Sequence, residues 1–299
     1  RCEHGGAAQS TAVCHENALN ALRTSVELSG DSAPQAEHML EALASEQSGA
    51  GGASRLQRAS PQFVRSLFDD FSDTFEEKLQ ALQYVVPQLV GETVALLAAL
   101  RGAPYANALD AGCGTGLAGP RLRPLISGAL VGVDLSEKML GLAAALRTPA
   151  PDAAAAAAGE AGTQVPVYSR LLAADLLSLR REALLPGTTA AEAPIELVAA
   201  ADVLVYFGEL GALLQAFASV TAEGGDLVFS CERASADEAP QGWRLRASGR
   251  FAHTKPYVLQ AAAAAGYTLL SYREITPRFE NGAAVQGHLF ALRRADVGR

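Results

Sequence analysis

The sequence predicts an α/β protein with a Rossmann-like, mostly parallel sheet and helices on both faces. An apolar run leads into the segment Leu109–Gly116, in which glycines stand at alternate positions behind Asp110. A second apolar run ends in Asp134, about 20 residues beyond this loop, where a ribose-binding acid is expected. Further apolar runs alternate with helical stretches, as parallel strands joined by helical crossovers require.

The predicted strands are legible as short apolar runs bounded by turn residues. They are Ala106–Asp110, Ala129–Asp134, Ser169–Ala173, Ile195–Ala200, Asp226–Cys231, Thr268–Tyr272 and His288–Leu292. The glycine-containing loop Glu280–Ala283 lies between the last two, which predicts a closing antiparallel hairpin.

Two helical segments precede the sheet. Residues 1–57 predict a helical appendage with the hairpin Ala12–Leu28 and Pro34–Leu43 and a Ser/Gly-rich linker, and residues 58–299 predict the main domain. One hairpin cannot bury its own face, so it either caps the domain or ends a truncated repeat array, and it offers a site for a protein partner. A second segment repeats apolar residues at helical spacing and is expected to pack on the sheet, with a lid over the ligand pocket as the alternative. Its residues are Phe68, Phe71, Phe75, Leu79 and Leu82.

Composition limits the class of protein. The 299 residues are 49% hydrophobic and 19% charged, which is ample for a buried core, and the net charge is −8. A negative chain repels DNA and RNA, so no nucleic-acid partner is expected. No long uncharged apolar run predicts a membrane span. We expect an intracellular, soluble protein of the cytoplasm or of an organelle, since the first residue is Arg and a targeting segment could have been removed.

No metal site is expected. Cysteines and histidines near the start of the chain could in principle bind zinc, but their irregular spacing argues against it. These residues are Cys2, His4, Cys14 and His15. The four cysteines of the chain form no Cys-x-x-Cys pair, which fits a reducing compartment.

Two ligand classes compete for the glycine loop. Gly114–Gly119 also matches the pattern that binds the pyrophosphate of a dinucleotide. Asp110 would repel that anion, whereas S-adenosylmethionine (SAM) carries a positive sulfonium and an ammonium and has no phosphate. The loop therefore favours SAM as cofactor, with an NAD(P)-dependent oxidoreductase as the disfavoured alternative.

The motifs resemble those of class I SAM-dependent methyltransferases. The segments that match are Leu109–Gly116, Val131–Met139, Ala174–Leu176, Leu197–Tyr206 and Gly224–Ser230. Arg58–Phe75 and Gly242–His253 resemble a subgroup of methyltransferases associated with tetratricopeptide (TPR) repeats. The resemblance covers roughly residues 58 to 294 and implies a seven-stranded sheet of order 3-2-1-4-5-7-6.

The donor site is the part of such an enzyme that sequence can predict, because methyl transfer mainly requires that donor and nucleophile be held in line. The glycines let the loop close under the methionine part, Asp110 meets the ammonium, and Asp134 holds the ribose. Asp175 accepts the adenine amine or caps a helix, and Met139 touches adenine or fills the core. The expected donor site is Asp110, Gly112, Gly114, Gly116, Asp134, Leu135, Met139, Asp175 and Leu176.

The acceptor side is less well specified. His253 is the most plausible general base, because imidazole titrates near neutral pH. Asp202 is the second catalytic candidate, because it follows the fourth strand, where donor and acceptor meet. Tyr206 would wall the acceptor pocket. Arg246 and Arg250 would bind an acidic acceptor, whereas the net charge of −8 would favour a cationic one, and the sequence leaves this open.

The resulting function is methyl transfer to an unidentified small molecule, or less favourably to a protein side chain. The Ala-Asp-Val-Leu sequence around Asp202 lacks the motifs of enzymes that methylate nucleobases. The alternative is a non-catalytic protein of this fold that binds a partner through its helical hairpin.

Overall fold

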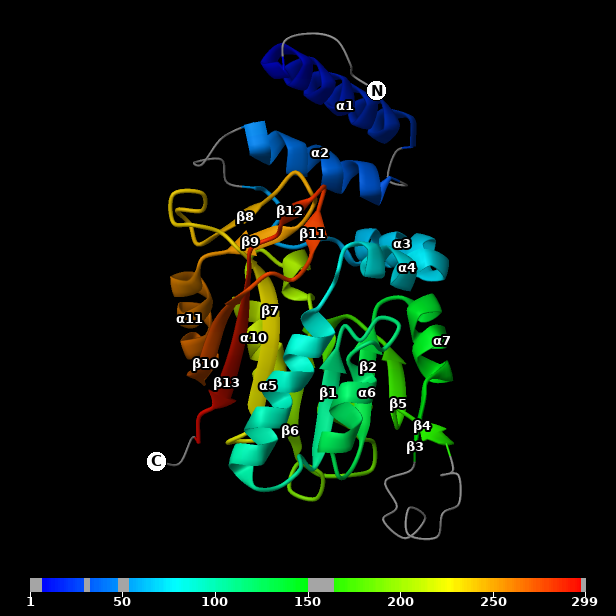
Figure 1. Ribbon diagram of the computed structural model, residues 1–299, viewed down its shortest axis with the longest axis vertical. Coiled ribbons are helices and arrows are strands. Elements are labelled where there is room, and N and C mark those ends of the chain that lie inside the picture. The colour runs from blue at the N-terminus through cyan, green and yellow to red at the C-terminus, as the bar shows by residue number, and fades with distance from the viewer. Residues whose placement is uncertain (1–6, 30–32, 48–53, 150–163, 297–299) are drawn as a thin grey trace.

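The computed structural model of this chain describes residues 7–29, 33–47, 54–149 and 164–296 (Figure 1). The α-helices are α1 Ala7–Ser29, α2 Pro34–Gln47, α3 Pro61–Phe71, α4 Phe75–Ala81, α5 Val86–Arg101, α6 Gly119–Leu122, α7 Glu137–Ala145, α9 Arg181–Leu184, α10 Gly211–Val220 and α11 Lys255–Ala264. Short 3-10 turns are η3 Ser72–Thr74, η4 Arg123–Leu125, η5 Leu176–Ser178 and η6 Leu204–Tyr206. The strands are β1 Asn107–Ala111, β2 Leu130–Asp134, β3 Arg147–Pro149, β4 Gln164–Pro166, β5 Arg170–Ala173, β6 Ile195–Ala200, β7 Asp226–Arg233, β8 Trp243–Leu245, β9 Phe251–His253, β10 Tyr267–Ile275, β11 Phe279–Glu280, β12 Ala283–Ala284 and β13 Gly287–Arg294.

The central sheet has the predicted strands and the predicted order. Its path is β10-β13-β7-β6-β1-β2-β5, which is 6-7-5-4-1-2-3 when the predicted strands are numbered along the chain. The strands from β5 to β7 are parallel, and β13 runs antiparallel between β7 and β10. The short strands β8 and β9 extend the sheet beside the end of β7. The α/β fold class is confirmed.

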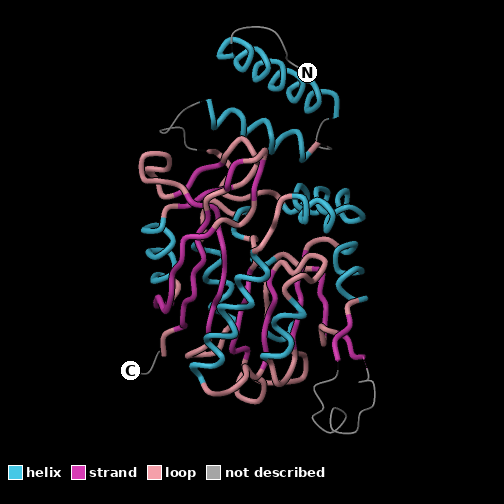
Figure 2. The backbone as a smooth tube through the Cα atoms, in the orientation of Figure 1, coloured by secondary structure: helices cyan, strands magenta, loops and turns pink. Residues whose placement is uncertain are grey.

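Helices cover both faces of this sheet (Figures 1 and 2). Successive strand residues point to opposite faces, so Ala108 packs with α5, α6 and α7, whereas Leu109 packs with α10 and α11. Val94 on α5 and Phe217 on α10 are fully buried against these two faces. Burial on both faces explains why the central strands read as continuous apolar runs rather than as alternating ones.

The hairpin between β10 and β13 carries its own small ribbon. Strands β11 and β12 pair antiparallel around Asn281 and Gly282, whose φ angles are 50° and 78°. Asn-Gly is the sequence that such a turn with two positive φ angles prefers. The β11–β12 ribbon lies above the upper edge of the sheet (Figure 1).

The aromatic segment before the sheet is not one helix. Helix α3 begins after Ser60, whose Oγ accepts the amide of Phe63 at 3.1 Å, and it ends at Phe71. Residues Ser72–Thr74 then form a 3-10 turn, in which the Ser72 hydroxyl donates to the carbonyl of Asp69 at 3.1 Å. Short polar side chains that bond to the backbone interrupt a helix in this way, and periodicity alone does not show it.

The two N-terminal helices form, and α2 packs on the rest of the protein. Ala42 is fully buried with Trp243, Leu245 and Phe251 of the β8–β9 segment. The predicted break and linker fall largely on residues 30–32 and 48–53, outside the described residues, as do Cys2 and His4. In the part of the chain that the structure describes, no group of His, Cys, Asp or Glu residues could hold a metal ion.

His38 joins α2 to the segment that precedes the sheet. Its ring stacks on Phe63 with the centroids 3.9 Å apart, and Nε2 donates to the carbonyl of Gly249 at 2.7 Å. We expect His38→Ala to lower the free energy of unfolding by about 2–4 kcal/mol, from the lost contact and the unpaired carbonyl. Urea denaturation measures this. Leu28→Ala is the control, because Leu28 is 83% exposed and its loss should change little; equal stability of both variants would contradict the docking of α2.

No single described helix combines the length and the apolar composition that a membrane crossing requires. By those two criteria alone, the pair Pro61–Ala81 and Val86–Arg101 passes together, although it is bent by 76°.

Candidate active site

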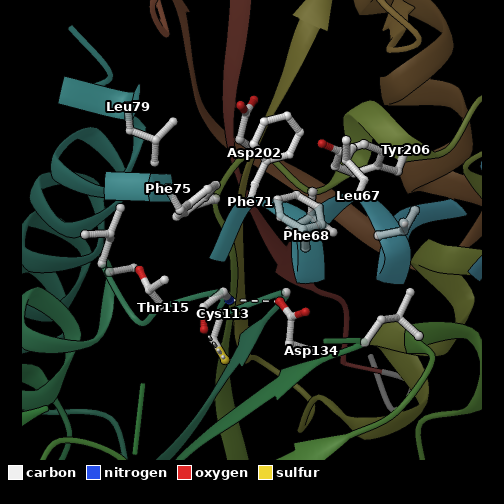
Figure 3. A pocket seen from close by; sticks show the side chains of 18 of the residues that line it. Leu67, Phe68, Phe71, Phe75, Leu79, Cys113, Thr115, Asp134, Asp202 and Tyr206 are labelled. Carbon is white, nitrogen blue, oxygen red and sulfur yellow. Dashed lines mark hydrogen bonds between the residues drawn. The ribbon is translucent and has the colours of Figure 1, made fainter. Parts of the chain in front are cut away.

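A cavity of about 320 Å³ lies at the carboxyl ends of the parallel strands, under α3 and α4 (Figure 3). Ligands of open α/β sheets bind at this edge, where connections leave β1 in opposite directions. Most of the predicted site residues line it. They are Asp110, Gly112, Gly114, Asp134, Leu135, Asp175, Leu176, Asp202, Tyr206 and Arg250.

The backbone conformation and the packing of the loop require glycine at these positions. Gly112, Gly114 and Gly116 have φ angles of 69°, 54° and 92°, a region that other residues rarely adopt. A Cβ at Gly112 would lie 2.5 Å from a methyl group of Val203, and one at Gly116 would lie 2.5 Å from Leu146. A Cβ at Gly114 would meet nothing within 4 Å, because this glycine faces the open cavity. Gly116 does not line the cavity and instead closes the loop against the core.

Substitution of these two glycines should have different effects on stability. We expect Gly112→Ala to lower the free energy of unfolding by about 2–4 kcal/mol, from backbone strain and the contact with Val203. Gly114→Ala should cost only about 1–2 kcal/mol, from strain alone. Thermal denaturation of both variants without ligand measures the difference. Equal losses would contradict the close approach to Val203.

The amides of this loop are already bound by the protein. Gly112 and Cys113 donate to the carbonyl of Val133 at 2.7 and 3.0 Å, and Gly114 donates to Asp134 Oδ2 at 2.8 Å. A pyrophosphate-binding loop needs such amides free. Thr115, by contrast, places a buried Oγ1 without a hydrogen-bond partner in the cavity wall. The loop thus offers a hydroxyl to a ligand, and most of its amides are already engaged.

Asp110 lies beneath the loop and is almost fully buried. The Tyr168 hydroxyl donates to its Oδ2 at 2.6 Å. Burial raises the pKa of Asp110 to about 6, although the bond from Tyr168 opposes this rise. A cationic ligand group would compensate the cost of the charged form. Tyr168 was not predicted, because nothing in the sequence links it to a residue so distant along the chain.

Asp134 ends β2 at the cavity and is held by backbone amides. Its oxygens accept from Gly114 at 2.8 Å and from Ser136 at 2.9 Å. Burial raises its pKa, and these amides oppose the rise. The carboxylate is therefore fixed in one orientation at the cavity wall, as a ribose-binding acid must be.

Asp175 has the capping role that was the alternative prediction. Its Oδ1 accepts the amide of Leu177 at 3.0 Å, at the start of η5. Arg58 also pairs with both oxygens, at 2.9 and 3.3 Å. Arg58 was missed, although it begins a segment that resembles the TPR-associated subgroup. The Asp175 carboxylate lines the cavity as part of an ion pair.

Asp202 lies beyond β6 with a φ of 61°, an unusual backbone conformation for a residue other than glycine. Its amide donates to Ser230 Oγ at 2.9 Å, and its Oδ2 accepts from Arg278 Nη1 at 3.0 Å. Such a conformation persists only when the surroundings impose it. The carboxylate is thereby fixed on the cavity wall opposite the glycine loop (Figure 3).

Arg278 is the principal residue that the sequence did not reveal. It is only 1% exposed. Besides Asp202, it pairs with Glu280 at 2.7 Å and with Glu232. The three acids raise its pKa, although burial opposes them. This Arg278 cluster fixes the far wall of the cavity.

Aromatic side chains close the cavity from above. Phe68, Phe71 and Phe75 line it from α3 and α4, and Phe68 meets the ring of Tyr206 edge to face at 5.6 Å. Figure 3 shows these rings gathered around Asp202, with Thr115 and Asp134 on the opposite side. Leu79 and Leu82 line the cavity as well. The face that was expected to pack on the sheet instead covers the ligand cavity, as the alternative prediction had it.

His253 is not placed as a base, and that expectation is wrong. It is fully buried away from the cavity lining, and its Nε2 donates to the carbonyl of Phe207 at 2.8 Å. Burial lowers its pKa to about 4, so the ring stays neutral. Its burial, its bond to the carbonyl of Phe207 and its stacking on the Tyr257 ring make it a structural histidine.

The expectation for Arg246 is wrong, and Met139 takes the core position that was its alternative. Arg246 lies outside the cavity lining, where it donates to the carbonyl of Arg233 at 2.9 Å and faces Glu232 and Glu238. Met139 is fully buried in α7 and fills the core rather than the cavity. Of the two predicted acceptor arginines, only Arg250 lines the cavity.

Comparison with known proteins identifies a family for this chain and solved structures with the same fold. Residues 62–272 match the family described as a methyltransferase domain. Magnesium protoporphyrin IX methyltransferase from Synechocystis PCC 6803, solved with bound S-adenosylhomocysteine (SAH), is 19% identical, with a TM-score of 0.51 over 79% of this chain and 99% of that chain. The 1,6-didemethyltoxoflavin-N1-methyltransferase of Burkholderia thailandensis is 17% identical, with a TM-score of 0.53 over 82% of this chain and 95% of that chain.

Comparison of the sequence with curated proteins gives no match. The family match nevertheless spans most of the chain and includes the glycine loop, Asp134, Asp202 and Arg250. The chain therefore belongs to the methyltransferase domain family, and the predicted class of SAM-dependent methyltransferase is confirmed.

Proposed function

We propose that this protein transfers a methyl group from SAM to a small organic acceptor. SAM supplies a methyl group already activated by its sulfonium. The residues of the chain hold the two reactants in line and exclude water, which is the main requirement of this reaction.

The observation that supports the donor most strongly is the buried carboxylate of Asp110 beneath a loop whose amides are mostly engaged. Such a loop favours a cationic ligand and disfavours a pyrophosphate. We propose that Asp110 and the Thr115 hydroxyl face the methionine part of SAM. Asp134 and Leu135 would face the ribose, and Leu176 the adenine. The alternative of a dinucleotide-dependent oxidoreductase loses support from the same observation.

The cavity supports a small acceptor. Its volume of about 320 Å³ is near the lower end of ligand cavities, and it has to hold the donor as well. The apolar cover from α3 and α4 leaves room for a compact molecule beside Asp202. The two solved methyltransferases compared above are named after the small molecules magnesium protoporphyrin IX and 1,6-didemethyltoxoflavin, and this agrees with a small-molecule acceptor.

The packing of α2 gives less support to the alternative of a non-catalytic scaffold protein. It relies on the N-terminal hairpin as a binding surface, but one face of α2 is already buried on the β8–β9 segment through Ala42 and His38. A protein partner at α1 remains a proposal, and so does membership of the TPR-associated subgroup.

Calorimetry with SAH and with NADH tests the proposed donor. We expect micromolar binding of SAH and no heat with NADH. Asp134→Asn should weaken SAH by about tenfold, through the ribose. Glu223→Gln serves as control, because Glu223 is exposed in the turn before β7, at the opposite edge of the sheet. Tight NADH binding without SAH binding would refute the proposal.

A further inference from the structure

The charged groups of the cavity restrict the chemistry of the acceptor. Among the described residues that line it, the cationic side chains are Arg58, Lys78, Arg250 and Arg278. An acidic acceptor would need an excess of positive charge among the groups around it. Their partners within the protein therefore decide whether a carboxylate could be bound.

Each arginine is already paired with a carboxylate of the chain. Arg278 donates from all three of its nitrogens, to Glu280, Asp202 and Glu232. Arg250 donates to Glu280 at 2.6 Å. Arg58, at the donor side, pairs with Asp175 through both terminal nitrogens, as described above. The four acids Asp175, Asp202, Glu232 and Glu280 outnumber the three arginines, so a carboxylate brought into the cavity would meet an excess of negative charge.

Lys78 is the remaining cation, and it lies over an aromatic ring. Its Nζ is 3.9 Å from the centroid of the Phe71 ring. This contact shows that the Phe71 ring takes a positive charge at its face. Phe68, Phe75 and Tyr206 belong to the same aromatic wall (Figure 3).

Asp202 provides the complementary group. Arg278 occupies only its Oδ2, and Oδ1 has no hydrogen bond to any other residue that the structure describes. The side chain is 17% exposed, and it lines the cavity beside Phe71. Its unusual backbone conformation and its bond to Arg278 hold this free oxygen in place. An N–H group of a ligand would therefore find a fixed acceptor there.

We propose that the methyl acceptor is an amine, with its nitrogen at Asp202 Oδ1 and a flat apolar body against the aromatic wall. The inference rests on the proposed function and specifies its substrate class. The amine binds as an ammonium and first passes one N–H proton to Oδ1. The freed nitrogen lone pair then forms the N–C bond, and the S–C bond breaks with its electron pair to sulfur. The product leaves as the methylated ammonium, and Oδ1 releases its proton to solvent. Asp202, the second residue predicted to be catalytic, thus takes the role that was expected of His253.

Three probes of similar shape test this with the protein loaded with SAH. Benzylamine, benzyl alcohol and benzoate differ in the group that would meet Asp202. Ligand-observed NMR titration measures the three dissociation constants. We expect benzylamine to bind about tenfold more tightly than benzyl alcohol, and benzoate to bind most weakly. With labelled SAM in place of SAH, label should appear in N-methylbenzylamine.

Asp202→Asn should remove the preference for the amine, whereas Glu223→Gln, which removes the same charge far from the cavity, should retain it. If Asp202→Asn no longer binds SAH, the ranking of the probes on the unsubstituted protein decides alone. Equal or tighter binding of the alcohol or the carboxylate, or no binding of any probe while SAH binds, overturns the inference and leaves the donor proposal intact. Failure of SAH itself to bind refutes the proposed function and the inference with it.

Discussion

Arg278→Met should be the most destabilising single substitution in the cavity wall, with a loss of about 3–5 kcal/mol in the free energy of unfolding at neutral pH. Arg278 is 1% exposed and pairs with Asp202, Glu232 and Glu280. Methionine fills similar space but leaves these acids without a counter-charge, and breaking a buried ion pair costs this much. Urea denaturation measures the loss.

The loss should depend on pH with a defined sign. Burial already raises the pKa of Glu232, and Arg278 opposes that rise. Without Arg278 the pKa of Glu232 in the folded protein rises further above its unfolded value. Stability is then fully present below the unfolded pKa and is lost as pH rises through the folded one. We expect the variant to approach the unsubstituted protein near pH 4 and to differ most above pH 7.

Two further variants separate charge from packing. The double variant Arg278→Met, Glu232→Gln should recover part of the loss, because it removes one of the unpaired acids. Arg273→Met removes an arginine from the exposed face of β10 and should change stability by less than about 0.5 kcal/mol. If Arg278→Met and Arg273→Met are equally stable, the Arg278 cluster contributes nothing to folding.

The fold could be predicted from the sequence because its signals are local. The parallel strands β1, β2 and β6 are buried on both faces, so they stand out as short apolar runs. Glycines with positive φ mark the loop after β1. The break between α3 and α4 could not be predicted, because the polar residues Ser72–Thr74 interrupt the helix without disturbing the apolar period.

The donor side was predictable and the acceptor side was not, for a physical reason. Asp110 and Asp134 end neighbouring parallel strands, so the topology alone brings them to one cavity. The acceptor side is built by side chains from distant segments. Arg278 meets Asp202 across 76 positions of sequence, and no periodicity records that contact. His253 was misjudged for the same reason, since burial rather than residue type decides whether an imidazole can act as a base.

Asp110→Asn should have opposite effects on stability and on donor binding. Burial raises the pKa of Asp110 from 3.8 to about 6, so the charged form is unfavourable in the folded protein without ligand. A raised folded pKa means that this contribution to stability is present below the unfolded pKa and lost as pH rises to about 6. At neutral pH we expect the asparagine variant to be more stable by about 2–3 kcal/mol. Near pH 3 to 4 the two proteins should be equally stable.

The same substitution should weaken SAM and SAH by about 10–100-fold, because a cationic ligand loses a charge-assisted hydrogen bond. Thermal denaturation across pH and calorimetry with SAH measure the two effects, and Glu223→Gln controls for the change in net charge. The two effects have one cause. The ionised carboxylate of Asp110 destabilises the protein without ligand, and a bound cation would compensate that charge. If the variant is less stable than the unsubstituted protein and its affinity for SAH is unchanged, the role of Asp110 is structural, through the hydrogen bond that it accepts from Tyr168.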